Sequence, residues 1–222
     1  MLLRVAVALA VLLPGLAAAK PIAFQDAVAT SFEYRPWMQR VESYYTPDVH
    51  LSLGGGFLHL DAVSASGGGH HHGGSQPSRD IGYLRLNVLA ERWNLPQAQG
   101  NWFLWGGLGA AHDAARSAML VPNFGSQFDF ETRRLYFSAR TDWHYAFTFR
   151  EGDHQVQFAV APYLHSYDGL ATWIVLDGHA MTGSVRHDPV AALLLRFFWH
   201  RVWLEGGADQ NGEFVGTLMF TL

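Results

Sequence analysis

One stretch of the sequence has the residue types to bind a metal ion. It holds three consecutive histidines, His70, His71 and His72, between the glycines at 67–69 and 73–74. Neutral imidazole is the commonest protein ligand for copper, zinc and nickel. In a polar, Gly-rich loop these rings would form a weak and exchangeable site, so we expect loosely bound copper, zinc or nickel and no tightly held cofactor. The alternative interpretation is a solvated low-complexity loop.

Nucleophilic catalysis needs a hydroxyl or thiol beside a base, and the sequence offers two groups of suitable side chains. They are Ser138, Asp142 and His144, and then His165, Ser166 and Asp168. Neither group comes with a Gly-x-Ser-x-Gly elbow or another recognisable hydrolase motif. We therefore predict a non-enzymatic protein and keep a lipid-modifying enzyme as an alternative.

A larger set of polar side chains could form a connected network if the chain folds into a barrel. The set is Arg85, Glu91, Arg134, Arg140, Asp142, His144, Gln157, His165, Arg196 and Glu205. Buried charges need partners because an unpaired buried charge is costly. The network is predicted to fill the lumen, and a narrow path through a wider barrel is the alternative.

The strongest structural signal lies in residues 135–149, which alternate with a period of two. Leu135, Phe137 and Trp143 share one apolar face, whereas Arg140 and Asp142 share the opposite, polar face. This alternation indicates one long strand with two different faces.

Weaker alternation recurs along the chain. It predicts strands at 49–62, 83–91, 102–111, 155–160, 171–177, 190–207 and 214–222. Eight strands result if 190–207 is one element, and ten result if it splits near His200 and 33–41 is added. Pro36 argues against that added strand unless it lies at an end or a bulge. The segments 63–80 and 112–130 are predicted to be long loops, and 93–100 and 151–153 to be shorter turns.

The composition favours a barrel whose outer surface contacts lipid. Charged residues make up 15% of the chain and aromatic residues 14%, and Lys20 is the only lysine among 15 basic residues. The exterior of a soluble, lipocalin-like barrel would carry many more charges, and aromatic residues near strand ends are typical of membrane interfaces. The closing Phe220-Thr221-Leu222 is an apolar strand end of the kind found in outer-membrane barrels. The prediction is an all-β, antiparallel transmembrane β-barrel of 8–10 strands, with a soluble periplasmic barrel as the rival.

The first 19 residues have the layout of a cleaved secretory signal peptide. Arg4 precedes an apolar run from Val5 to Leu13, and small residues follow at 17–19. Residues 20–222 are then predicted to form a single barrel domain. The chain has no cysteine and a formal net charge of −4, which gives no reason to expect disulfides or nucleic-acid binding.

Several short phrases resemble a family of small, uncharacterised proteobacterial outer-membrane proteins. They are residues 20–24, 83–87 with 92–95, 105–109, 131–134, 161–165 with 170–173, and 219–222. The resemblance covers most of the chain after the signal peptide and supplies no catalytic residues. It implies an outer-membrane location and a role close to copper handling. The copper link that the resemblance implies need not involve His70, His71 and His72.

These observations predict a monomeric barrel in the outer membrane of a Gram-negative bacterium, exported by its signal peptide. The expected function is non-enzymatic binding, tolerance or passage of metal, copper in particular. The expected partners are membrane lipid, lipopolysaccharide, periplasmic chaperones and the barrel-insertion machinery. A narrow channel and a purely structural barrel remain alternatives.

Overall fold

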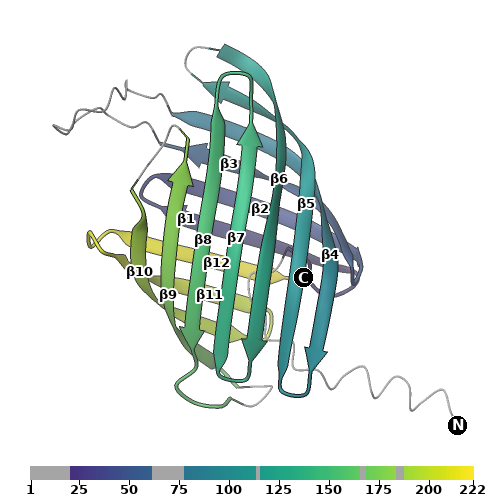
Figure 1. Cartoon of the computed structure of the whole chain (residues 1–222), viewed down its shortest axis with the longest axis vertical. Coiled ribbons are helices and arrows are strands. Elements are labelled where there is room, and N and C mark those ends of the chain that lie inside the picture. The colour runs from purple at the N-terminus through teal and green to yellow at the C-terminus, as the bar shows by residue number, and fades with distance from the viewer. Residues whose placement is uncertain (1–20, 62–77, 114–115, 166–168, 184–187) are drawn as a thin grey trace, which may run out of the picture.

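The computed structural model describes residues 21–61, 78–113, 116–165, 169–183 and 188–222, which form one closed antiparallel β-barrel (Figure 1). Its strands are β1 (Ala27–Arg35), β2 (Met38–Asp48), β3 (Leu51–Leu60), β4 (Arg79–Leu95), β5 (Ala98–Asp113), β6 (Arg116–Thr132), β7 (Leu135–Tyr145), β8 (Arg150–Val160), β9 (Ala171–Thr182), β10 (Val190–Trp199), β11 (Val202–Asp209) and β12 (Phe214–Thr221).

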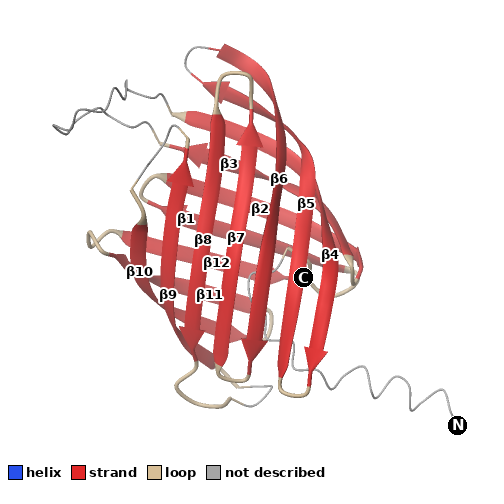
Figure 2. Ribbon diagram, in the orientation of Figure 1, coloured by secondary structure: helices blue, strands red, loops and turns tan. Residues whose placement is uncertain are grey.

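Every strand pairs with its neighbours in sequence, and β1 pairs with β12 to close the barrel. The closing register places Ala29 opposite Thr221 and Tyr34 opposite Gly216. Within the described residues the secondary structure consists of strands, loops and turns (Figure 2). No helix in these residues is long and apolar enough to cross a membrane.

The predicted fold class is confirmed, but the predicted count of 8–10 strands is wrong, because the barrel has 12. The segment 33–41 is not one strand. Pro36 and Trp37 form the turn between β1 and β2, so proline sits between two strands. The predicted loop 112–130 consists largely of β6, and the split of 190–207 near His200 is confirmed.

The long element predicted at 135–149 also needs correction. Strand β7 ends at Tyr145, and the Ala146 amide donates to the Phe149 carbonyl oxygen at 2.9 Å across a tight connection. The turn predicted at 151–153 lies inside β8. The alternation of β7 is confirmed over 135–145, where even-numbered residues face the lumen.

The barrel has an apolar outside and a polar inside. Large apolar side chains project outward from strands all around it, for example Leu84 (72% exposed), Leu193 (63%) and Leu176 (57%). Arginine and carboxylate side chains lie on the inward face and are almost fully buried. A soluble barrel has the opposite arrangement, so these faces define a transmembrane barrel of the outer-membrane type.

The two rims of the barrel differ, and we name them by the chain ends. The terminal rim carries the start of β1, the end of β12 and the connections 49–50, 96–97, 133–134, 161–170 and 200–201. The opposite rim carries the connections 36–37, 61–78, 114–115, 146–149, 183–189 and 210–213. Four of the five connections at the terminal rim are thus two-residue turns, whereas the 18-residue connection 61–78 lies at the opposite rim.

Three apolar clusters fill the lumen near its two ends. The opposite-rim cluster consists of Trp37, Met38, Leu58, Leu60, Ile81, Tyr83, Ala111, Val121, Phe149, Met181 and Val190. Towards the terminal rim, one cluster on β7–β12 includes Trp173, Leu194 and Trp203. A smaller cluster there packs Ile22, which precedes β1, against Leu89, Phe103 and Trp105. The charged residues lie between these apolar layers.

Lumen-facing glycines let large rings lie flat against the barrel wall. A Cβ atom added to Gly125 would lie 2.5 Å from the Trp105 indole nitrogen and 2.3 Å from the Thr141 carbonyl oxygen. The Trp105 ring therefore occupies the space above Gly125. This packing fixes the direction in which the indole N–H group of Trp105 points. Such pairing of glycine with an aromatic ring is a common stabilising device in curved sheets.

Candidate functional site

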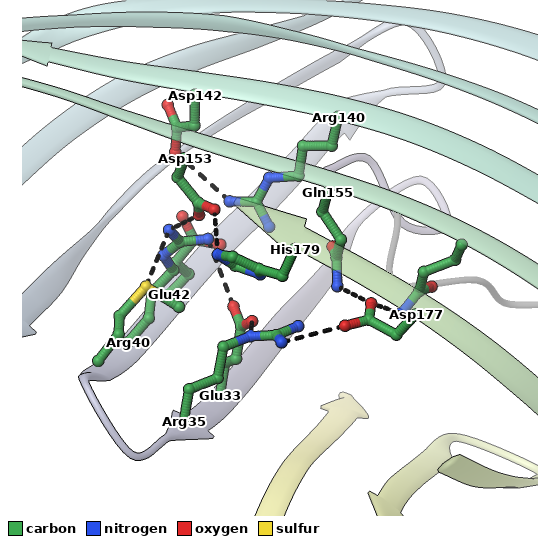
Figure 3. Close-up of polar contacts among 12 residues, drawn as sticks. Glu33, Arg35, Arg40, Glu42, Arg140, Asp142, Asp153, Gln155, Asp177 and His179 are labelled. Carbon is green, nitrogen blue, oxygen red and sulfur yellow. Dashed lines mark hydrogen bonds and ion pairs between the residues drawn. The ribbon is translucent and has the colours of Figure 1, made fainter. Parts of the chain in front are cut away.

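A belt of charged side chains crosses the middle of the lumen (Figure 3). We call it the charged belt, and it consists of Glu33, Arg35, Arg40, Glu42, Arg85, Arg140, Asp142, Asp153, Asp177, His179, Arg196 and Glu205. These residues come from β1, β2, β4 and β7–β11, so the belt joins opposite walls of the barrel.

Two arginines of the first hairpin reach across the lumen to β8 and β9. Arg35 donates to Asp177 at 3.0 Å, and Arg40 forms an ion pair with Asp153. Glu33 accepts from Arg35 at 2.9 Å and from Arg40 at 3.3 Å, so one carboxylate links the two bridges (Figure 3). Both guanidinium groups are thereby compensated, as buried charges require.

Asp142 accepts hydrogen bonds from three side chains of the lumen, Arg85, Trp105 and Arg140. Both terminal nitrogens of Arg85 donate to its carboxylate at 3.1–3.2 Å, and the Trp105 indole nitrogen donates at 2.9 Å. Arg85 also lies over the Tyr83 ring at 4.4 Å. Because Gly125 fixes the Trp105 ring, the indole, the carboxylate and the guanidinium form one rigid group.

A second set of contacts lies nearer the terminal rim. Arg196 donates to Glu205 at 2.6 Å and to the Gln157 side-chain oxygen at 2.7 Å. The Gln157 side-chain nitrogen donates to Asp177 at 3.1 Å, which connects this set to the belt. The Arg196 guanidinium packs over Trp203 at 4.4 Å, so the apolar cluster also supports it.

A cavity of about 80 Å³ lies inside the belt. Its polar walls include Glu33, Arg40, Glu42, Arg85, Arg140, Gln127, Gln155, Gln157, Ser138 and Glu205. Pro21, Ala29 and Met219 also line it, so it extends towards the terminal rim. A water molecule needs about 10–15 Å³ of such space, so the cavity can hold a few waters or one small solute.

Most of the predicted lumen residues do face the lumen. Arg85, Arg140, Asp142, His144, Gln157, Arg196 and Glu205 are inward and largely buried, as predicted. Three residues of the predicted set do not face the lumen. Glu91 is exposed because the β4–β5 register shifts between Leu89 and Glu91, Arg134 lies in the β6–β7 turn, and His165 lies in the connection after β8.

The first hydroxyl–carboxylate–imidazole group cannot form a catalytic triad. Ser138 and His144 both face the lumen on β7 but are six residues apart, which is about 20 Å along a strand. In the second group, Ser166 and Asp168 lie outside the described residues. The non-enzymatic function itself stays a prediction.

One hydroxyl–imidazole chain does exist, on the outward face. The His154 ring accepts or donates hydrogen bonds with Thr141 at 2.9 Å and Thr182 at 3.1 Å, which links β7, β8 and β9. The Trp143 ring packs edge-on against the imidazole at 5.1 Å. These hydrogen bonds between Thr141, His154 and Thr182 are explained by their stabilisation of the pairing between neighbouring strands.

The predicted metal ligands His70, His71 and His72 lie outside the described residues. The structure fixes only the two ends of their loop, at Leu60 and Arg79 on the opposite rim. Among the described residues no group of three or more His, Cys, Asp or Glu side chains could hold a metal ion. Metal binding therefore stays a prediction.

The sequence reasoning missed most of the belt's partners. Glu33, Arg35 and Arg40 lie in 33–41, which was considered only as one added strand of the ten-strand alternative; Glu42 lies just beyond it, and Asp153 was placed in a turn. A signal was present, because Glu33 and Arg35, like Arg40 and Glu42, are spaced by two on either side of Pro36. That spacing places each pair on one face of a strand.

Comparisons with known proteins add little to this description. No family model and no curated protein matches the sequence. Among solved structures, the chain is similar to OmpTdeltaL8, a loop L8 deletion mutant of OmpT, an outer membrane protein of Vibrio cholerae. The two are 9% identical with a TM-score of 0.34, over 88% of this chain and 97% of the other. Similarity at that level carries no argument about activity, so the family resemblance and its link to copper stay predictions.

Proposed function

We propose that this chain is a non-enzymatic component of the outer membrane of a Gram-negative bacterium, and that its barrel is closed to solutes at rest. The observation that supports closure is the opposite-rim cluster, whose apolar side chains come from β2–β6, β9, β10 and two turns. A 12-strand barrel is wider than the eight-strand barrels that side chains just fill. Here arginines and aromatic rings fill the additional width.

The proposed orientation has the terminal rim in the periplasm. Outer-membrane barrels have short periplasmic turns and longer outside loops. Two-residue connections make up four of the five at the terminal rim and two of the six at the opposite rim. In this orientation the opposite-rim cluster separates the belt from the outside, and the cavity faces the periplasm. The surrounding partners would be lipid and lipopolysaccharide, with insertion by periplasmic chaperones and the barrel-insertion machinery.

Single-channel recording in planar lipid bilayers tests closure. The wild-type protein should show no steady conductance, whereas a Trp37→Ala/Phe149→Ala variant should conduct because two large rings leave the opposite-rim cluster. The matched control is Trp93→Ala/Phe137→Ala, which removes two outward-facing rings and should stay closed. A steadily open wild-type channel would contradict the proposal and favour the alternative of a narrow channel.

We also propose weak metal binding by His70, His71 and His72. The proposal is supported by the three adjacent imidazoles, since neutral imidazole is the commonest protein ligand for these metals. Where the loop leaves and rejoins the barrel, His59 contacts Asp80 at 2.6 Å and Asp61 at 3.4 Å. In the proposed orientation both ends of the loop lie at the rim that faces the outside of the cell. Calorimetric titration with Cu(II), Zn(II) and Ni(II) should give binding that a triple His→Ala variant loses. Equal binding by both proteins would contradict this proposal.

A further inference from the structure

One arginine of the charged belt differs from the others in its exposure. The side chains of Arg35, Arg40 and Arg85 are 2% exposed and that of Arg196 is 4% exposed, but that of Arg140 is 18% exposed. Arg140 lines the cavity, so its open surface faces that space. The described part of the barrel thus presents a guanidinium group towards a small internal cavity.

The contacts of Arg140 are also weaker than those of its neighbours. Its Nη2 atom donates to Asp142 at 3.4 Å, whereas Arg85 already contacts both oxygens of that carboxylate at 3.1–3.2 Å. A guanidinium group has five N–H donors. Arg140 thus makes one long hydrogen bond to Asp142 and interacts electrostatically with Glu42, which leaves N–H donors of its guanidinium group for a ligand in the cavity.

The neighbouring strands place amide and hydroxyl groups beside this guanidinium. In the strand register Arg140 lies between Gln127 on β6 and Gln155 on β8, and both side chains line the cavity. Ser138 is the next lumen-facing residue of β7 towards the terminal rim. Arg140 and Gln155 project into the same space in Figure 3, where Gln155 is held by Asp177 at 2.7 Å.

We infer that Arg140, Gln127, Gln155 and Ser138 form a binding site for the carboxylate of a small solute that enters from the terminal rim. The planar fork of a guanidinium group matches a carboxylate through two parallel hydrogen bonds. The amide and hydroxyl groups can donate to the remaining lone pairs. The cavity volume of about 80 Å³ limits the solute to a few heavy atoms beyond the carboxylate.

The charges that line the cavity allow such a ligand. Arg40, Arg85 and Arg140 equal Glu33, Glu42 and Glu205 in number, so the lining itself carries no net charge when all six are ionised. The rest of the belt adds Arg35 and Arg196 against Asp142, Asp153 and Asp177, which leaves one excess negative charge with His179 neutral. Among the arginines of the lining, the closest hydrogen bond to a belt carboxylate is longest for Arg140, so an entering carboxylate would be directed to its guanidinium group. This inference does not depend on closure of the opposite rim, because the cavity extends towards the terminal rim.

The test uses trifluoroacetate, a small carboxylate, and the full-length mature protein folded in detergent micelles. Fluorine NMR should show line broadening of trifluoroacetate that depends on protein concentration and that acetate reverses. Arg140→Gln should weaken binding about tenfold or more, because a charge-assisted bidentate contact is lost. The matched control Arg150→Gln removes an outward-facing arginine and should bind as the wild type does.

Two further measurements keep the result interpretable. Ser138→Leu keeps every belt charge and fills part of the cavity, so it should abolish binding. This variant tests the site even if Arg140→Gln fails to fold. Heat-modifiable migration on gels reports whether each variant forms a barrel. Absence of broadening with the wild type, or equal binding by wild type, Arg140→Gln and Ser138→Leu, would overturn the inference. Reversal by phosphate but not by acetate would overturn the carboxylate assignment.

Discussion

Replacing Asp142 by asparagine should be one of the most destabilising isosteric changes in this barrel. Asp142 is fully buried and accepts from both terminal nitrogens of Arg85 and from the Trp105 indole. Asparagine keeps the shape but removes the negative charge, which leaves Arg85 with Glu42 at 3.4 Å as its nearest acid. Removing one partner of a buried ion pair costs about 3–5 kcal/mol of unfolding free energy. Because Glu42 still compensates Arg85 in part, we expect a loss of about 3 kcal/mol.

Equilibrium urea unfolding in lipid vesicles, followed by tryptophan fluorescence and gel migration, measures this loss. The double variant Arg85→Gln/Asp142→Asn is the informative control, because it removes the unpaired charge together with its partner. Its loss of unfolding free energy should be at least about 1 kcal/mol smaller than the sum of the two single losses. The reasoning fails if Asp142→Asn unfolds like the wild type, or if the two losses simply add.

Four further changes test the barrel by the same unfolding measurement. Gly125→Ala should cost about 1–3 kcal/mol, because its Cβ would displace the Trp105 ring, and unchanged stability would contradict that packing. A Cβ at Gly82 or Gly212 meets nothing within 4 Å, but Gly212 has a φ of +79°. Gly82→Ala should therefore be neutral or stabilising and Gly212→Ala should cost about 1–2 kcal/mol, and the reverse order would refute this. Leu84→Arg should cost about 2–4 kcal/mol in lipid, and a neutral result would argue against a lipid-facing Leu84.

The faces of the barrel could be predicted from the sequence where alternation was undisturbed. In β4 from Tyr83 to Val88 and in β7 from Leu135 to Tyr145, the inward and outward sets were correct, because a period of two fixes both faces once one of them is apolar. The prediction failed where the period changes. Glu91 follows a register shift in β4, and its side chain is exposed instead of lumenal.

Strand β6 was missed because proline, glycine and asparagine dominate its middle. Pro122 pairs with β5, whereas the pairing with β7 begins at Asn123, so the missing N–H group of the proline costs no hydrogen bond to β7. Gly125 is required by the Trp105 ring and does not indicate a loop. Pro122 and Gly125, residue types that usually interrupt strands, are thus tolerated in β6 because of contacts that exist only in the folded barrel.

The partners within the belt could not be predicted at all. Alternation indicates that Arg40 faces inward, but its partner Asp153 is 113 residues away and lies on the opposite wall. Which carboxylate it meets depends on the number of strands and on the stagger between them. An error of two to four strands in that count changes every partner across the lumen.

The bridges across the lumen also have a consequence for assembly. Arg35 and Asp177 are 142 residues apart in sequence, and they can meet only after the sheet has curled so that β1 approaches β12. Until then the inward charges of an incomplete sheet lack their partners, and exposing them to lipid would be costly. Insertion intermediates whose sheet enters the bilayer before β1 pairs with β12 are therefore unfavourable. As a result, the charged belt favours concerted insertion of a nearly complete barrel.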